Sequence, residues 1–278
     1  MNAQAAPKSF RQRVLDGEPV FGTFGFLPDP AVIEIMGMAG MDYVIIDLEH
    51  APKDWQTVEN MVRAAELRGI APLIRVHENR EKDILQALET GATGIVVPFV
   101  QNAEQARHAG ASVRFPPDGI RGTCTLSRSS FYSARRSEFL EHTRQANREI
   151  LLIGLIEDQE GIDNIDEIVR AEPGPEVYLV GRGDLGTALG TPGQPDSPAV
   201  TAATDAIFKA LDGVPNRHVA MGVYGPAEVA PWYARGCRFF FYSSDTAILY
   251  NAVRGLTDAF HETVAAAAAP DKAKRSAG

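Results

Sequence analysis

Eight short apolar runs alternate with eight longer helical patterns along the chain, and this alternation most constrains the fold. The apolar runs are rich in β-branched residues, and Gly, Pro or Asp marks the changes between the two patterns. Strands that alternate with helices form parallel sheets. No composition break marks where one open, doubly wound sheet would end and another begin. We therefore predict an α/β protein with a single-domain (β/α)₈ TIM barrel.

The predicted strands are Val20–Gly25, Tyr43–Asp47, Ala71–Val76, Gly94–Pro98, Leu151–Glu157, Val177–Gly181, Val219–Val223 and Phe239–Tyr242. The predicted helices lie near Ala31–Ala39, Trp55–Arg68, Glu81–Thr90, Ala103–Gly110, Gly161–Ala171, Ala199–Leu211, Pro226–Arg235 and Thr246–Ala266. We assign residues 1–264 to the barrel and 265–278 to a disordered tail. The Arg- and Ser-rich connection Phe115–Gln145 is long enough to fold over the barrel mouth.

Composition narrows the class of protein. The 278 residues are 45% hydrophobic and 23% charged, which supports a large core. The net charge of −9 and the scattered basic residues argue against nucleic-acid binding, so a small-molecule ligand is expected. We find no signal peptide and no apolar run long enough for a membrane span, which predicts a cytoplasmic protein. Cys124 and Cys237 are expected to be free thiols.

The second predicted strand ends in a cluster of titratable groups. Asp47, Glu49 and His50 follow the apolar run Tyr43-Val-Ile-Ile directly, and burial in a core cannot explain two acids and an imidazole there. In a parallel barrel the C-terminal ends of all strands meet at one mouth, where catalytic residues gather. The cluster is therefore a candidate for part of an active site.

Three other strand ends carry functional groups. Arg75 ends the third strand, Glu157 the fifth, and Asp184 follows the sixth. Each one alone could be a helix cap or a structural ion-pair partner. Glu157 and Asp184 lie on adjacent strands, where two carboxylates repel unless a proton or a cation lies between them. An oxygen-only pair suits a hard divalent ion such as Mg²⁺ or Mn²⁺.

The segment Gly181-Arg-Gly-Asp-Leu-Gly186 matches the G-x-G-x-x-G pattern of dinucleotide-binding folds. Here it follows the sixth strand rather than the first, and Gly190–Pro195 interrupts the helix that it should open. We therefore predict no nicotinamide, flavin or other organic cofactor. The glycines instead allow backbone N–H groups to approach an anionic ligand beside the metal.

These residues resemble a known family. The segments that carry the resemblance are Asp47–Pro52, Leu73–Arg75, Gly91-Ala, Val97-Pro98, Pro116–Gly122, Ile156-Glu157 and Gly181–Leu185. They look like the metal-dependent (class II) pyruvate aldolases of the HpcH/HpaI family, which act on 4-hydroxy-2-oxoheptanedioate, 2-dehydro-3-deoxyglucarate and 2-keto-3-deoxy-L-rhamnonate. The resemblance spans roughly Phe10 to Phe260, and the motifs keep the family's order.

The resemblance implies roles for individual residues. Glu157 and Asp184 would hold a divalent ion, Mg²⁺, Mn²⁺ or Co²⁺. His50, paired with Asp47, would serve acid/base catalysis, and Arg75 would hydrogen-bond the keto or enolate oxygen of the substrate. A homo-oligomer is also implied, a hexamer whose terminal helices are exchanged.

Some further positions follow from the resemblance less directly. Glu89 stands where the family has an acid that supports the histidine across the mouth, and we include it with the catalytic residues. Arg182-Gly183 stands where many members have Pro-Ala. With Asp184 these two are candidates for substrate binding, although Arg182 could instead pair with a neighbouring acid or face solvent. The role of Glu49 stays open between structural partner and catalyst.

The expected activity is that of a lyase, an aldehyde-lyase that reversibly cleaves a 4-hydroxy-2-oxo acid to pyruvate or hydroxypyruvate plus an aldehyde through a metal-stabilised enolate. No predicted strand contains a lysine, which argues against a Schiff-base mechanism. Alternatives that keep the enolate are a decarboxylase like macrophomate synthase and an acyl-CoA lyase. A non-catalytic barrel that binds 2-oxo acids is the alternative from another class.

Overall fold

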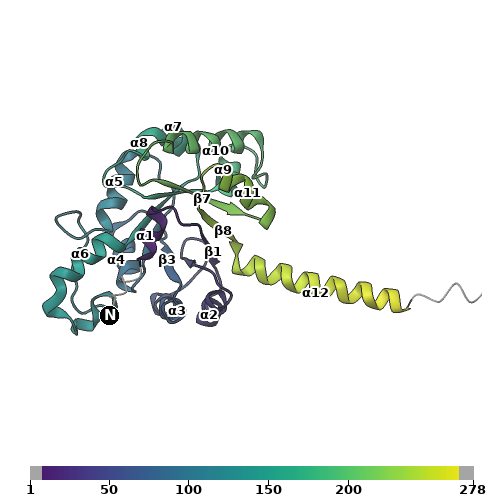
Figure 1. Ribbon diagram of the computed structural model, residues 1–278, viewed down its shortest axis with the longest axis horizontal. Coiled ribbons are helices and arrows are strands. Elements are labelled where there is room, and N and C mark those ends of the chain that lie inside the picture. Colours follow the sequence, from purple (N-terminus) through teal and green to yellow (C-terminus); the bar gives the residue numbers. More distant parts are fainter. Residues whose placement is uncertain (1–7, 269–278) are drawn as a thin grey trace, which may run out of the picture.

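The computed structural model describes residues 8–268. Eight parallel strands pair in sequence order, and β8 pairs with β1 to close the barrel (Figure 1). The strands are β1 Val20–Gly25, β2 Tyr43–Asp47, β3 Ala71–Arg75, β4 Gly94–Val97, β5 Leu151–Ile156, β6 Val177–Val180, β7 His218–Val223 and β8 Phe239–Ser244. The predicted (β/α)₈ barrel is confirmed.

Helices surround the barrel (Figure 1). They are α1 Phe10–Leu15, α2 Pro30–Met38, α3 Trp55–Arg68, α4 Glu81–Glu89, α5 Ala103–Ser112, α6 Phe139–Glu149, α7 Gln159–Asp163, α8 Ile165–Ile168, α9 Arg182–Ala188, α10 Pro198–Leu211, α11 Val229–Ala234 and α12 Asp245–Ala268, with 3₁₀ turns η1 Arg128–Ser133, η2 Arg136–Glu138 and η3 Pro226–Glu228. The helix predicted over Gly161–Ala171 is two short helices, α7 and α8, and the predictions omitted α1, α6 and α9.

Side chains alternate between two cores along each strand. On β2, Val44 and Ile46 face the helices, whereas Tyr43 and Ile45 face the barrel interior. Since successive strand residues point to opposite faces, Asp47 continues the interior-facing series at the end of the strand. The aromatic ring of Phe10 on α1 packs against Tyr43 at the opposite end, with 5.6 Å between ring centroids. The interior is therefore filled, and its C-terminal end carries polar groups.

The connection between α5 and β5 lies at the N-terminal end of the barrel. Helices run antiparallel to the strands, so α5 ends at the end opposite the mouth, and the connection starts there. Its Arg128 donates to the carbonyl of Thr90, just past the end of α4, at 2.7 Å, and pairs with Glu66 near the end of α3. The expectation that this segment covers the mouth is wrong.

Helix α12 extends away from the barrel (Figure 1). Several of its large apolar side chains are exposed, namely Leu249, Tyr250, Val253, Leu256, Phe260 and Val264. Residues 265–268 continue this helix, and the rest of the predicted tail lies outside the described residues. Within residues 8–268, none of the helices has the length and hydropathy that a membrane crossing requires.

Candidate active site

A cavity of about 300 Å³ opens at the C-terminal end of the strands. Side chains from seven of the eight strands or the residues just after them line it, which is the arrangement that the barrel geometry predicts. His50, Arg75, Glu157, Arg182, Gly183 and Asp184 are among its lining residues. Asp47 and Glu49 lie immediately behind this lining, in contact with Arg75.

Asp47 and Arg75 form a buried, two-pronged ion pair. The parallel register of β2 and β3 sets the two residues directly beside each other. Arg75 donates from Nε to Oδ1 at 2.7 Å and from Nη2 to Oδ2 at 2.8 Å. The Asp47 side chain is completely buried, and the guanidinium lies 4.7 Å from the ring centroid of Phe24. This geometry leaves the guanidinium one orientation at the cavity wall.

Glu49, rather than Asp47, is the acid near His50. The Glu49 carboxylate lies 3.2 Å from Nη1 of Arg75 and 3.8 Å from Nε2 of His50. Burial raises the pKa of Glu49, although the charge of Arg75 opposes that shift. The His50 side chain is 51% exposed at the rim. His50 is thus in reach of both a substrate and solvent, with a carboxylate behind it.

Glu157 is a buried carboxyl group that faces the cavity. It is 2% exposed, and its Oε1 accepts a hydrogen bond from the backbone N–H of Phe99 at 2.9 Å. Phe99 has φ of 49°, a conformation that is uncommon for a bulky residue. Gly181 is required beside it, because a Cβ there would lie 2.6 Å from that of Glu157. Burial, with added repulsion from Glu49 and Asp184, raises the pKa of Glu157 to about 7.

Asp184 reaches the same cavity from the first turn of α9. It is exposed, as is Gly183 beside it. Arg182 is different, because its guanidinium already has partners: Nη1 donates to Asp196 at 2.7 Å, and Nη2 donates to the carbonyl of Gly222 at 2.8 Å. A second acid, Glu228, lies 3.3 Å from Nη2. Sequence reasoning missed α9, whose glycines disfavour a helix on propensity alone.

Glu89 is not among the residues that line this cavity. It ends α4, and because helices run antiparallel to the strands, it lies at the N-terminal end of the barrel, where its charge acts on Arg121. The structure therefore brings together all the predicted site residues within one chain except Glu89.

The predictions also missed the aromatic side of the cavity. Phe24, Phe26 and Phe241 form one wall, and the rings of Phe24 and Phe241 meet edge to face with 5.2 Å between centroids. Ser243 and Ser244 at the end of β8 add hydroxyl groups to the lining. The sequence signal that could have identified these residues was their position at or near the C-terminal ends of predicted strands. The three aromatic rings thus add apolar surface to a cavity that also holds two carboxylates.

The donor set fits a divalent cation with two protein ligands. Glu157 and Asp184 face one cavity, and the charge of Asp184 raises the cost of ionising Glu157. The two guanidinium groups in the lining, Arg75 and Arg182, are already paired with Asp47 and Asp196, so they do not neutralise these carboxylates. Within residues 8–268, no cluster of three or more His, Cys, Asp or Glu side chains is arranged to hold a metal. The fit is therefore to an ion such as Mg²⁺, which retains waters or substrate oxygens in its shell.

The chain is similar to known proteins over most of its length. The family model for HpcH/HpaI aldolase/citrate lyase matches residues 21–220. The 5-keto-4-deoxy-D-glucarate aldolase of Shigella dysenteriae is 32% identical over 264 residues, which are 94% of this chain and 99% of that protein. An Escherichia coli enzyme of the same name has the same identity and coverage.

Solved structures of related proteins are similar to this chain over most of its length. The crystal structure of the citrate synthase SbnG has a TM-score of 0.83 and 30% identity, covering 92% of this chain and 98% of that one. A HpcH/HpaI aldolase/citrate lyase family protein from Burkholderia cenocepacia has a TM-score of 0.84 and 28% identity, over 90% of this chain and 98% of the other. These relatives confirm the predicted family and support the prediction of an aldolase, a carbon–carbon lyase. The chain belongs to the HpcH/HpaI aldolase/citrate lyase family.

Proposed function

We propose that the protein is a divalent-metal-dependent aldolase that reversibly cleaves a 4-hydroxy-2-oxo acid to pyruvate, or hydroxypyruvate, and an aldehyde. The observation that carries the proposal is the buried carboxyl of Glu157, whose pKa is raised to about 7, beside Asp184 in a cavity that also holds Arg75 and His50. Two curated relatives are named for 5-keto-4-deoxy-D-glucarate. Numbered from its keto end, that compound is a 2-oxo acid with a 4-hydroxyl group, so it belongs to the proposed substrate class.

Glu157 and Asp184 would hold the ion, Mg²⁺, Mn²⁺ or Co²⁺, which would supply a Lewis acid that stabilises the negative charge of the enolate. Arg75 would donate a hydrogen bond to the keto oxygen, where negative charge develops as the C3–C4 bond breaks. Asp47 would act as a positioning residue, because it fixes the guanidinium without lining the cavity itself.

His50 would accept the proton of the 4-hydroxyl group. Cleavage then leaves the bonding electrons of C3–C4 on the pyruvate fragment, and the carbonyl of the aldehyde forms at C4. The Glu49 carboxylate lies 3.8 Å from Nε2 of His50. The exposure of His50 allows it to exchange that proton with solvent between cleavage and synthesis.

The carboxylate of the substrate would lie beside α9. Gly183 has no side chain and is exposed at the cavity, so the backbone there is accessible to an anion. Asp184 would contact the same end of the substrate through the ion. We propose that Arg182 contributes to substrate binding only through its positive charge at the cavity wall, because both of its Nη atoms already donate hydrogen bonds within the protein. For Glu89, the family's catalytic role stays a prediction from the resemblance.

Removing and restoring the metal tests the proposed activity. We expect protein stripped with a chelator to lose pyruvate release from 4-hydroxy-2-oxo acids, including 5-keto-4-deoxy-D-glucarate, and to recover it with Mg²⁺, Mn²⁺ or Co²⁺. The measurement is a coupled assay of pyruvate. Absence of activity with every ion and every such substrate would sink the aldolase proposal.

A second reaction would use the same site for a different enolate. Similarity to the solved citrate synthase favours condensation of an acyl-thioester enolate with a keto acid. That reaction predicts metal-dependent exchange of the α-protons of acetyl-CoA in deuterated water. The aldolase instead predicts exchange of the pyruvate methyl protons and pyruvate release from a 4-hydroxy-2-oxo acid, so these measurements together separate the candidates.

His50→Ala should slow cleavage by about 10²–10⁴-fold, the usual contribution of general acid–base catalysis. Metal affinity, measured by calorimetry, should not change, because His50 is not a proposed ligand. His77→Ala is the matched control: it removes an exposed histidine just past the end of β3 that does not line the cavity. A similar loss in both variants would contradict the role of His50.

We also propose a homohexamer with α12 in the subunit interface. The exposed apolar side chains of this 24-residue helix support an interface on it. A cytoplasmic location stays a prediction from the sequence.

A further inference from the structure

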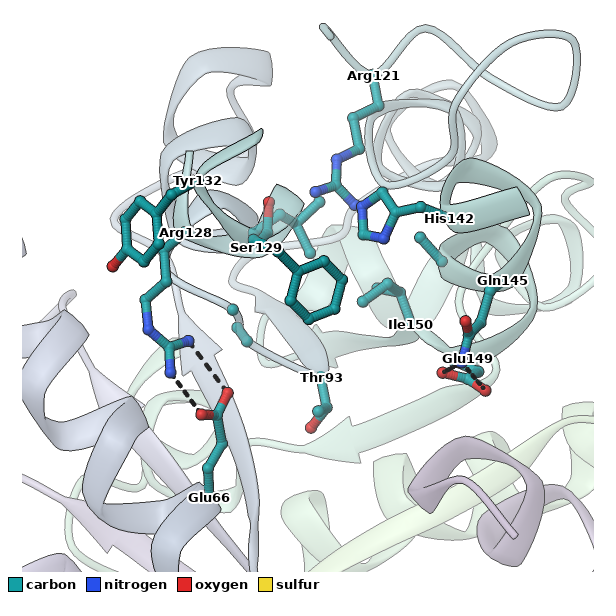
Figure 2. A pocket seen from close by; sticks show the side chains of 15 residues that line it. Glu66, Thr93, Arg121, Arg128, Ser129, Tyr132, His142, Gln145, Glu149 and Ile150 are labelled. Carbon is teal, nitrogen blue, oxygen red and sulfur yellow. Dashed lines mark hydrogen bonds and ion pairs between the residues drawn. The ribbon is translucent and has the colours of Figure 1, made fainter. Parts of the chain in front are cut away.

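A second cavity, of about 630 Å³, lies at the N-terminal end of the barrel, remote from the mouth. It is bounded by the ends of α3 and α4 and by the connection from α5 to β5 (Figure 2). Arg121, Arg128 and His142 are among its lining residues. None of these three has a role in the proposed aldolase reaction.

Arg121 is a buried cation without a partner. Its side chain points into the cavity (Figure 2), and the residue is only 4% exposed. Within residues 8–268 its guanidinium makes no hydrogen bond and no ion pair, and Nε and Nη1 are fully enclosed. One face of the guanidinium lies 4.2 Å from the ring centroid of Phe115, which leaves the N–H groups at its edge unsatisfied.

The backbone holds Arg121 rigidly in this position. Its N–H donates to the carbonyl of Arg114 at 2.8 Å, and the N–H of Ile120 donates to that of Ala111 at 2.9 Å. Gly119 allows this close approach, since a Cβ there would lie 2.2 Å from the Ala111 oxygen. These contacts fix the backbone at Arg121, and the burial of its side chain encloses the guanidinium in the cavity.

Neighbouring arginines differ from Arg121, because each of them is paired with an acid. Arg128, in the same cavity, is neutralised by Glu66 and donates to Thr90. Arg114 pairs with Glu176 at 2.8 Å. Burial lowers the pKa of Arg121 to about 10, so it still carries its charge at neutral pH. The charge of Glu89 opposes this shift but lies beyond ion-pair distance, so burial of the Arg121 charge is still costly and a bound anion would reduce that cost.

His142 supplies a second polar group. Its Nε2 is buried and has no hydrogen-bond partner within the described chain. Burial, with repulsion from Arg121, lowers its pKa, so the imidazole is neutral near pH 7 and can donate or accept one hydrogen bond. The rest of the wall includes apolar surface from Phe131 and Ile150.

We propose that this cavity is a binding site for a small organic carboxylate, whose anionic group pairs with Arg121 and hydrogen-bonds His142 while its apolar body packs against Phe131 and Ile150. The volume lies in the range of small-molecule sites, about 300–1,000 Å³. A single charge is favoured over a phosphate dianion, because Arg121 is the one unpaired arginine that residues 8–268 place in the lining, and the carboxylate of Glu149 also lines the cavity.

Benzoate tests this proposal, with benzamide as an uncharged probe of the same shape. In chelator-treated protein we expect calorimetry to detect benzoate binding, which Arg121→Met weakens by about tenfold or more, as expected for a lost charged hydrogen bond. Benzamide should bind at least about tenfold more weakly than benzoate. His142→Phe, which keeps Arg121, should weaken benzoate by several-fold. Asp184→Asn, at the mouth, should leave the benzoate affinity unchanged.

Thermal melting shows whether Arg121 has a structural role instead. Arg121→Met removes an unpaired charge and keeps an unbranched chain, so its Tm should equal or exceed that of the wild type. A large fall in Tm would overturn the proposal, because it would mean that the charge has a partner. So would the absence of benzoate binding at millimolar concentration, or binding lost in Asp184→Asn and kept in Arg121→Met. A change of sedimenting species in Arg121→Met without benzoate binding would assign the anion to a second copy of the chain, which also overturns it.

Discussion

Glu157→Gln is expected to abolish turnover and, at the same time, to stabilise the metal-free protein near pH 8. Loss of the ion should reduce cleavage by about 10³-fold or more, since a Lewis acid contributes several kcal/mol to such a reaction. Glutamine has the shape of the original side chain, and its oxygen can still accept from Phe99. It lacks the charge whose burial raises the pKa of Glu157 from 4.5 to about 7. That shift corresponds to up to about 3 kcal/mol of unfolding free energy.

The pH dependence of stability gives the sign of this effect. The folded protein binds the Glu157 proton more tightly than the unfolded chain does, so the stabilisation is complete below pH 4.5 and is lost as the pH rises through about 7. Burial raises the pKa of Glu49 in the same direction. Denaturant unfolding of metal-free wild type should therefore show falling stability across this window, and Glu157→Gln a flatter profile. Metal affinity should rise across the same window, because the ion needs the ionised carboxylate.

Asp184→Asn is the matched control. Its carboxylate lines the same cavity but is exposed, so its removal should cost metal binding and turnover. It should stabilise the metal-free protein much less than Glu157→Gln does, because it removes only the repulsion between the two carboxylates and not the buried charge. Equal stabilisation in both variants would mean that general charge repulsion, rather than burial of Glu157, sets the effect. Normal turnover in Glu157→Gln would contradict the proposed metal site.

The end of the barrel at which the site residues lie could be predicted from the sequence, because strand periodicity and chain direction determine it. Residues alternate between the two faces of a strand, and parallel strands end at one mouth. Asp47, Arg75 and Glu157 all follow this rule, and each lies at the predicted end of the barrel. The rule involves only local pattern and chain direction, so it needs no knowledge of which side chains meet.

The partners of these groups could not be predicted in the same way. The register of β2 and β3 pairs Asp47 with Arg75, whereas the family resemblance implied a pair with His50. The partners of Arg182 come from residues 14 and 46 positions later, and no short-range signal encodes them. The prediction for the α5–β5 connection was wrong for a different reason. It used only the length of the connection. The helix before it, α5, ends at the N-terminal end of the barrel, so the connection begins far from the mouth.

The Asp47–Arg75 pair should be essential both for folding and for catalysis, and a double-mutant cycle separates the two. Arg75→Met leaves a completely buried carboxylate unpaired, which typically costs about 3–5 kcal/mol of stability. It should also reduce cleavage by about 10²–10³-fold, the usual loss for one donor to a developing oxyanion. Asp47→Asn combined with Arg75→Met removes both charges, so it should recover most of the stability and none of the turnover. Denaturant unfolding and the pyruvate assay measure the two effects on the same proteins.

Exchange of pyruvate methyl protons then locates the catalytic defect. Arg75 is proposed to act on the keto oxygen, so the stable double variant should lose proton exchange together with cleavage. His50→Ala should differ, because its proposed role is at the 4-hydroxyl group: exchange should persist while cleavage slows. If the double variant exchanged protons at the wild-type rate, Arg75 would be a structural residue only. If it recovered turnover along with stability, the guanidinium would have no part in stabilising the enolate.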